Sequence, residues 1–205
     1  DIVKKLKKEI EDKIGQELLY AGCAIPPGTE NLDGGVVKNV AESSGFIVEE
    51  VYDEPTAANT LLKLDNGAVI DIGGGTTGIS VIKNHKIVEV FDEPSGGTHF
   101  SLVLSGAYKI DFDSAEELKR DFNKHNEIFP VVRPVIDKII SIIENSIKNQ
   151  DIDQMVLVGG TALLTGIEEY IEEKTKIKTI KPKNPMFVTP IGIALSLIED
   201  NHARK

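Results

Sequence analysis

The chain has 205 residues, of which 40% are hydrophobic and 27% charged, and its formal net charge is −10. This composition is that of a globular protein with one or two domains, and the acidic balance argues against a nucleic-acid-binding protein, which carries a basic face. A disulfide framework is excluded because Cys23 is the only cysteine, and its apolar surroundings are typical of a buried thiol in a cytosolic protein. No stretch reaches the roughly 18 apolar residues that cross a membrane.

The first part of the chain alternates helices and strands. Ile2, Leu6, Ile10 and Ile14 recur at helical spacing before Gly15, which predicts an amphipathic helix. We expect a strand within 18–25, a helix over 36–44, a short strand over 46–51 and a helix over 56–64. This rhythm is typical of a layered α/β sheet.

The most informative stretch is 71–78, which follows an apolar strand at 68–70. It places a carboxylate first, then three glycines and two hydroxyls: Asp71, Gly73, Gly74, Gly75, Thr76 and Thr77. Amides of successive glycines can approach a ligand closely and form an anion-binding concavity, while a carboxylate can hold a divalent cation through its waters. The stretch therefore predicts a site for a metal-bound polyphosphate, with Asp71 facing the metal; a plain glycine-rich hairpin is the alternative.

Two other phosphate-binding loops are excluded. Residues 73–78 match G-x-G-x-x-G, but a dinucleotide-binding loop must be followed by a helix. Here a second strand over 79–82, a turn and a third strand over 87–91 follow, which predicts a hairpin that closes over phosphate. The chain has no G-x-x-x-x-G-K-[ST] run, so it has no P-loop.

The second part of the chain adds helices and one buried strand. We expect a helix over 100–108, and a second one that Ser114 caps together with Glu117. A long helix is expected to open at Pro130, followed by a strand at 155–158, a helix over 162–174 and a last helix over 190–200. Gly96 and Gly97 punctuate the chain after the third strand.

Three further groups are candidates for ligand contact. Gly159, Gly160 and Thr161 follow the strand at 155–158, where a ribose or flat ring could reach the backbone; a simple strand-to-helix turn is the alternative. Glu116 and Lys119 share one helix face and could bind ribose hydroxyls, or could form only a surface ion pair. Glu54, just before a helix that starts near Pro55, could orient a water for attack on phosphorus, or could merely complement the helix dipole.

In this order, the motifs resemble those of the actin-like ATPase superfamily, which includes DnaK-type chaperones, MreB, FtsA and sugar kinases. Residues 54–58 look like the first connecting motif, 71–77 like the second phosphate motif and 156–161 like the adenosine motif. Residues 115–119 resemble the ribose-contacting helix, and 190–194 the second connecting motif. The resemblance implies a two-lobed α/β fold of the ribonuclease H-like type that binds ATP and Mg²⁺ in a cleft.

A narrower resemblance, to the EutJ family of ethanolamine utilisation, runs nearly end to end. It rests on residues 26–29, 53–57, 64–66, 71–79 and 187–194. It implies a cytoplasmic, chaperone-like or reactivating factor associated with a bacterial microcompartment, with a protein client among the ethanolamine-degrading enzymes and no nucleic acid or membrane partner. It also implies that residues 73–77 hold the β- and γ-phosphates, Asp71 faces magnesium, and Glu54 lies near the attacking water. Glu116 and Lys119 would then meet the ribose, and residues 159–161 the adenosine.

The chain departs from the superfamily pattern at three points. The first phosphate hairpin, an acid–glycine motif, is missing before the first helix, so we expect weak ATPase activity only in the full-length protein. Gly78 and Leu163 stand where DnaK-type chaperones carry an acid and the arginine that stacks on adenine.

We expect a partial domain I at 1–66, to which the helix at 190–203 returns, and a domain II at 67–189, with hinges at Pro55 and near Gly192. A structural actin-like scaffold with a degenerate nucleotide site is the alternative function, and a small-molecule kinase is the third.

Overall fold

The computed structural model describes residues 2–25 and 33–203, so the loop expected at 26–29 lies outside the described residues. The chain divides into two compact units. Unit 1 comprises residues 1–63 and 189–205, and unit 2 comprises residues 64–188. The chain passes between them at 63–64 and at 188–189, so Pro55 and Gly192, where we expected hinges, both lie inside unit 1.

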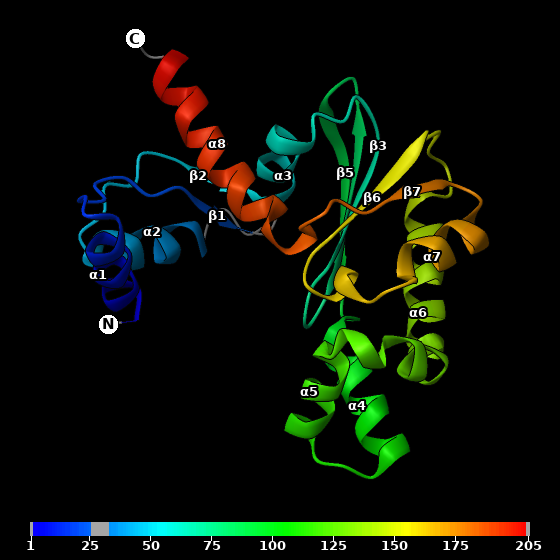
Figure 1. Cartoon of the computed structure of the whole chain (residues 1–205). Helices are drawn as coiled ribbons and strands as arrows, with labels where there is room; N and C mark the ends of the chain where they lie inside the picture. Colours follow the sequence, from blue (N-terminus) through cyan, green and yellow to red (C-terminus); the bar gives the residue numbers. More distant parts are fainter. Residues whose placement is uncertain (1, 26–32, 204–205) are drawn as a thin grey trace. The chain divides into compact units, whose positions relative to one another are not determined.

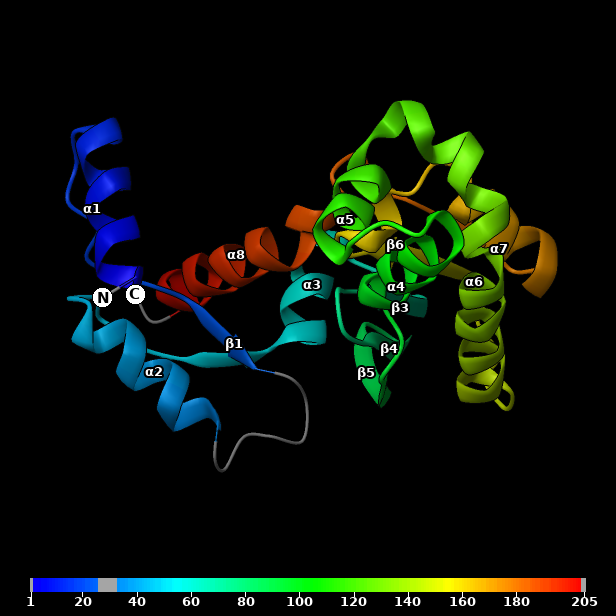
Figure 2. The same ribbon diagram turned by 90° about the horizontal axis from the view of Figure 1, so that it is seen from below.

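Unit 1 is a small α/β unit. Its elements are α1 (Ile2–Ile14), β1 (Cys23–Ile25), α2 (Asp33–Ser43), β2 (Val51–Asp53), α3 (Glu54–Leu62) and α8 (Val188–Ala203), whose first residue belongs to unit 2. The strands β1 and β2 are parallel and form a two-stranded sheet (Figure 2). Both are shorter than predicted, since residues 46–51 enter β2 only at Val51 and Tyr20 joins Ile47 through an isolated bridge.

Helix α1 forms where the sequence predicts it, but its apolar stripe is not buried. Ile2, Leu6, Ile10 and Ile14 are between 46% and 77% exposed. The adjacent face makes the contacts: the Lys7 ammonium donates to the Gly45 carbonyl at 2.5 Å, and Glu11 accepts from the Leu18 amide at 2.8 Å. The periodicity therefore predicts the helix correctly, and the packing of unit 1 decides which face makes contacts.

Unit 2 is built on a five-stranded mixed sheet of order β5-β4-β3-β6-β7 (Figure 1). The strands are β3 (Asn66–Ile72), β4 (Thr77–Lys83), β5 (Lys86–Glu93), β6 (Gln154–Val158) and β7 (Lys178–Ile180). Strands β3, β4 and β5 form the antiparallel meander that the glycine hairpin predicts, and β6 pairs in parallel with β3 and β7. The sequence gives no sign of β7, which is only three residues long.

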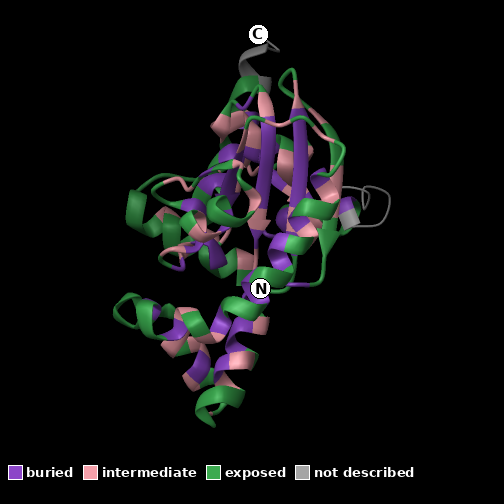
Figure 3. Ribbon diagram, turned by 90° about the vertical axis from the view of Figure 1, so that its right-hand side faces the viewer, coloured by how far each residue is buried: buried purple, intermediate pink, exposed green. Residues whose placement is uncertain are grey.

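The helices of unit 2 cover the sheet and carry several of the predicted ligand residues. They are α4 (Gly97–Tyr108), α5 (Phe112–Arg120), α6 (His125–Ile147) and α7 (Ile167–Thr175), with short 3₁₀ turns η1 (Phe122–Lys124), η2 (Thr161–Leu163) and η3 (Pro185–Phe187). Figure 3 shows the central strands coloured mostly as buried. The core lies between these strands and the apolar stripe of α6, where Val132, Ile136 and Ile139 are fully buried.

The N-terminal ends of α5, α6 and α7 differ from the prediction in ways that have a physical reason. Asp111, not Ser114, caps α5, because its carboxylate accepts from the Ser114 amide at 2.8 Å and so satisfies an unpaired amide of the first turn. Helix α6 begins at His125 and contains Pro130, because Ile128 belongs to the same buried stripe and its packing outweighs the hydrogen bond that proline cannot make. The helix predicted over 162–174 is split into η2 and α7.

Candidate functional site

The two glycine motifs meet at one edge of the unit 2 sheet. Strands β3 and β6 are parallel, with Asp71 opposite Val158, so the segments that follow them leave the sheet at the same end. The Thr161 hydroxyl donates to the Gly73 carbonyl at 2.8 Å and ties the two motifs together. Gly159 adopts φ +89°, a conformation that favours glycine, and its backbone passes beside the Asp71 carboxylate.

The glycine hairpin is anchored through its carbonyls and leaves amides available. The amides of Gly97 and Thr98, at the start of α4, donate to the carbonyls of Gly73 and Gly74 at 2.9 and 2.7 Å. The Gly73 amide closes the turn on Thr76 at 3.0 Å. Within the described residues, the amides of Gly74, Gly75 and Thr76 donate to no protein acceptor, and these three residues are exposed. The turn therefore presents successive amides of the kind that bind anions.

The side chains of Thr77 and Asp71 have different surroundings. Thr77 is completely buried and its hydroxyl donates to the Ser95 carbonyl at 2.6 Å, so this side chain holds the segment before α4 and does not face a ligand. We therefore remove the Thr77 hydroxyl, and the Gly73 amide, from the predicted phosphate donors. Asp71 is half-buried at the end of β3, beside Gly159, where the motifs meet.

Glu116 and Lys119 form an ion pair that is built into the site. The Lys119 ammonium lies 2.6 Å from the Glu116 carboxylate and also donates to the Gly97 carbonyl and the Ser101 hydroxyl, both at 3.0 Å. Arg120 contacts the other oxygen of Glu116 at 2.9 Å. Burial raises the pKa of the Glu116 carboxyl, but hydrogen bonds from Lys119 and Ser101 and the charges of Lys119 and Arg120 lower it more, so its pKa lies below the ordinary value. The pair thus joins α5 to the start of α4.

A cavity of about 570 Å³ opens beside this pair, entirely within unit 2. Its volume lies in the range of small-molecule sites, which is about 300–1,000 Å³. Predicted ligand residues and several apolar side chains share its wall: Gly74, Phe100, Glu116, Lys119, Arg120, Phe122, His125, Gly160, Thr161, Leu163, Leu164 and Met186. These groups are suited to a nucleotide, because exposed amides lie at the hairpin and charged and apolar side chains line the cavity.

Our sequence reading missed most of the cavity's other wall. Phe100, Phe122, His125 and Met186 come from three separate segments, so no local motif contains them, whereas Leu164 lies with Leu163 beside the stretch that resembles the adenosine motif. The one available signal is the Gly96–Gly97 pair. Its missing side chains allow close packing, because a Cβ at Gly97 would collide with the Thr161 hydroxyl and a Cβ at Gly96 would lie 2.7 Å from the Gly73 carbonyl oxygen.

His125 is a buried polar side chain beneath the cavity. Its Nδ1 accepts from the Thr165 amide at 2.9 Å, and its Nε2 lies 3.0 Å from the Lys119 carbonyl. An amide can only donate and a carbonyl can only accept, so these contacts assign a neutral ring with the proton on Nε2. Burial lowers the pKa of His125 below its ordinary value, although the Lys119 carbonyl acts in the opposite direction.

This arrangement predicts that unit 2 loses stability in mild acid. The lowered pKa of His125 means that the unfolded chain binds more protons than the folded one as pH falls below about 6.5. The free energy of unfolding, measured with urea at several pH values, should therefore decrease from pH 7 towards the lowered pKa. His125→Gln should flatten this decrease, whereas His85→Gln, which removes a histidine whose side chain is 68% exposed, should retain it. Equal slopes for native protein and His125→Gln would contradict the prediction.

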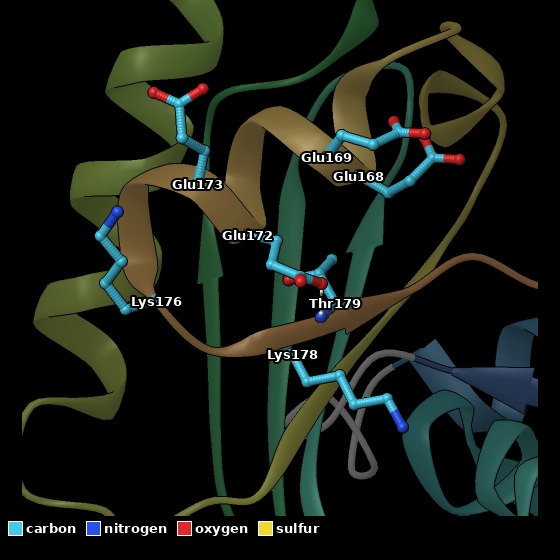
Figure 4. A pocket seen from close by; sticks show the side chains of 7 residues that line it. All are labelled: Glu168, Glu169, Glu172, Glu173, Lys176, Lys178 and Thr179. Atoms are coloured by element: carbon cyan, nitrogen blue, oxygen red, sulfur yellow. Dashed lines mark hydrogen bonds between the residues drawn. The ribbon is translucent and has the colours of Figure 1, made fainter.

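A second hollow, of about 730 Å³, lies between α7 and β7 and suits a nucleotide poorly (Figure 4). It is lined by four glutamates, two lysines and a threonine, so its carboxylates outnumber its cations and would repel phosphates: Glu168, Glu169, Glu172, Glu173, Lys176, Lys178 and Thr179. Two of them have structural partners: Glu168 pairs with Lys181 at 2.5 Å, and Glu172, turned towards Thr179, accepts its amide at 2.8 Å. No group of three or more potential metal ligands occurs among the described residues.

Glu54 lies in unit 1, as the first residue of α3. Asp53 caps this helix by accepting from the Thr56 amide at 2.8 Å, and Pro55 occupies the first turn, as the sequence predicts. Asp53 therefore performs the capping role, and Glu54 stays a predicted site residue that belongs to a different unit from the cavity.

Several known proteins resemble this chain in sequence and in structure. Residues 56–190 match the family model described as type IV pilus assembly protein PilM. The ethanolamine utilization protein EutJ of Escherichia coli (strain K12) is 39% identical over 196 residues, which cover 95% of this chain and 69% of that protein. The chain belongs to the EutJ family.

Solved structures agree with this membership. The crystal structure of EutJ from Carboxydothermus hydrogenoformans superposes with a TM-score of 0.90 at 47% identity and covers 95% of this chain and 72% of that one. MreB 5 of Spiroplasma citri, solved bound to AMPPNP, gives a TM-score of 0.81 at 19% identity, covering 98% and 76%. This EutJ-family chain thus has the mixed α/β actin-like ATPase fold. None of its described helices has the length and apolar character needed to span a membrane.

Proposed function

We propose that this EutJ-family protein binds Mg-ATP in the unit 2 cavity and acts as a chaperone-like or reactivating factor on enzymes of ethanolamine breakdown, in the cytoplasm and in association with a microcompartment. The observation that carries the nucleotide proposal is the junction of the hairpin and the cavity through the Thr161–Gly73 hydrogen bond. It brings exposed amides, a charged pair and apolar walls into one site. The nucleotide bound to the Spiroplasma MreB of the same fold supports the proposal.

In this proposal each part of the nucleotide is bound by residues of suitable chemistry. The amides of Gly74, Gly75 and Thr76 would hold phosphate oxygens, and Asp71 would face the magnesium ion through its waters. Glu116 and Lys119 would meet the ribose hydroxyls, and the backbone at Gly159, Gly160 and Thr161 would pass beside the adenosine.

Hydrolysis is proposed to be weak. Bound Mg²⁺ would neutralise charge on the phosphates, and Glu54 is the residue proposed to orient the attacking water. Nucleotide binding would change the affinity for a protein client, because a ligand that binds one conformation better shifts the population towards it.

The decisive test blocks the cavity without disturbing the fold. Gly160 has φ −68° and ψ −33°, and an added Cβ would meet only the Met186 sulfur, at 3.9 Å, so larger residues fit the backbone. We expect Gly160→Leu to fill the cavity and reduce Mg-ATP affinity at least tenfold in calorimetric titration, with Gly160→Ala remaining within about threefold of the native protein. Absence of binding to the native protein at millimolar Mg-ATP would sink the proposal.

A second candidate function is an assembly protein that does not depend on nucleotide. The match of residues 56–190 to the PilM family model favours it. Sedimentation of the protein with and without Mg-ATP separates the two functions. A nucleotide-dependent change supports the first, and assembly that ignores Mg-ATP supports the second.

A further inference from the structure

Helix α1 carries an apolar stripe that stays exposed in the described part of unit 1. The α1 stripe consists of Ile2, Leu6, Ile10 and Ile14, and no residue of this helix is buried. Because these side chains are four residues apart, they form one ridge along the helix, which lies at the edge of unit 1 (Figure 2). A ridge of this kind packs between the side chains of another helix and is then removed from water.

The neighbouring side of α1 is tied to unit 1, so the stripe is held in one orientation. The Lys7 ammonium donates to the Gly45 carbonyl and lies 4.7 Å from the centre of the Phe46 ring. Glu11 accepts from the Leu18 amide at 2.8 Å. The side chains of Lys7 and Glu11 are only 11% and 23% exposed. A partner that covers the α1 stripe therefore loses little conformational entropy in ordering this helix.

The charges of α1 are distributed unevenly along its length. Four of the five residues over 4–8 are lysines, whereas three of the four residues over 9–12 are acids. Lys5, Glu9 and Asp12 share an exposed face that borders the α1 stripe, because residues at i, i+4 and i+7 lie above one another on a helix. Within one chain, Lys5 and Glu9 lie 4.0 Å apart and both side chains are more than half exposed, so their mutual attraction is weak. These charges are thus available to a second molecule.

We propose that α1 is a self-association surface, on which two copies of this protein pack their α1 stripes antiparallel about a two-fold axis. The axis places the first half of each helix against the second half of the other, so Leu6 of one copy faces Ile10 of the other. The same flank of each stripe meets across the axis, so Lys5 of each copy lies beside Glu9 and Asp12 of the other. A parallel pair would instead set the two lysine-rich halves side by side, where like charges repel. The charge pattern therefore favours a second, antiparallel copy as the occupant.

This inference does not depend on the proposed nucleotide binding. Helix α1 belongs to unit 1, whereas the cavity proposed for the nucleotide lies entirely within unit 2. Failure of the protein to bind Mg-ATP would consequently leave the dimer proposal standing, and failure to dimerise would leave the nucleotide proposal standing.

The first test measures molecular mass by sedimentation equilibrium at protein concentrations from about 10 µM to about 1 mM. We expect the native chain to pass from monomer to dimer within this range, because the contact is a single pair of short helices. Leu6→Asp should weaken the dimer at least tenfold, since it places a carboxylate at the centre of the α1 stripe. The matched control is Leu102→Asp in α4, which removes a leucine of similar exposure, 54% against 52%, and should leave the dimer unchanged. Circular dichroism and urea unfolding verify that both variants fold.

A charge exchange tests the antiparallel arrangement. Lys5→Glu alone, and Glu9→Lys with Asp12→Lys in a second variant, should each weaken the dimer roughly fivefold or more, because every flank then faces like charges. An equimolar mixture of the two variants should recover dimers at least as stable as the native ones, since opposite charges meet again on both sides of the axis.

Four results would overturn the inference. A native chain that stays monomeric at 1 mM leaves the α1 stripe to a different partner and refutes the dimer. A dimer that Leu6→Asp retains lies on another surface. An equal loss in Leu102→Asp would mean that added negative charge alone opposes association. Charge variants that do not recover on mixing would exclude the antiparallel arrangement.

Discussion

Replacing Gly192 with alanine is expected to destabilise unit 1 by about 3 kcal/mol or more, because it forces two helices apart. Gly192 is buried in α8 against α3, where an added Cβ would overlap the Ala57 carbonyl oxygen and lie 2.6 Å from its carbon. The obstacle is backbone, which cannot rotate away as a side chain does. The Thr60 and Ser196 hydroxyls, 2.9 Å apart, bridge the same two helices and should separate with them.

The same substitution at Gly106 is the matched control for this experiment. Gly106 is exposed in α4, and an added Cβ there meets nothing within 4 Å. Gly106→Ala should stabilise the protein by about 0.5–1 kcal/mol, because alanine favours the helix over the unfolded chain. Urea unfolding followed by circular dichroism measures both changes, and hydrogen exchange shows whether α3 and α8 lose protection. A Gly192→Ala protein as stable as the parent would show that these helices do not pack as described.

Replacing Gly159 with alanine should have a comparable effect in unit 2, at the junction of the two glycine motifs. Two costs combine: the left-handed φ of +89°, which costs about 1–2 kcal/mol for a residue with a side chain, and a Cβ placed 2.5 Å from the Ile72 carbonyl oxygen. We expect a loss of about 3 kcal/mol or more in the free energy of unfolding, accompanied by loss of nucleotide binding.

The Gly166→Ala variant distinguishes the cost of the left-handed backbone at Gly159 from the cost of the steric overlap there. It has nearly the same φ, +87°, but an added Cβ would meet only the Phe129 ring, at 3.6 Å, which is an ordinary contact. Gly166→Ala should therefore lose only the conformational part, about 1–2 kcal/mol. If both variants lose the same free energy in urea unfolding, the close packing of β6 against β3 at Gly159 is not what requires glycine there.

Local sequence predicts much of this fold because strands and turns carry short-range signals. The order strand, glycine run, strand predicts the β3–β4 hairpin and excludes a dinucleotide-binding loop, since the residues after Gly78 alternate as a strand does. The stripe from Val132 to Ile147 likewise predicts the buried face of α6. The order of the motifs indicates the actin-like fold, because each motif occupies a characteristic place in the chain.

Other features follow only from the tertiary structure. The sequence predicts which residues could bind phosphate, but the packing of α4 decides that the Gly73 and Gly74 carbonyls are engaged while amides beyond them stay available. The tertiary structure also buries the Thr77 hydroxyl. Periodicity predicts α1 and says nothing of which face contacts the rest of unit 1. Phe122 and Met186 share a cavity because distant segments fold together, and no periodicity within either segment records a contact made across 64 positions.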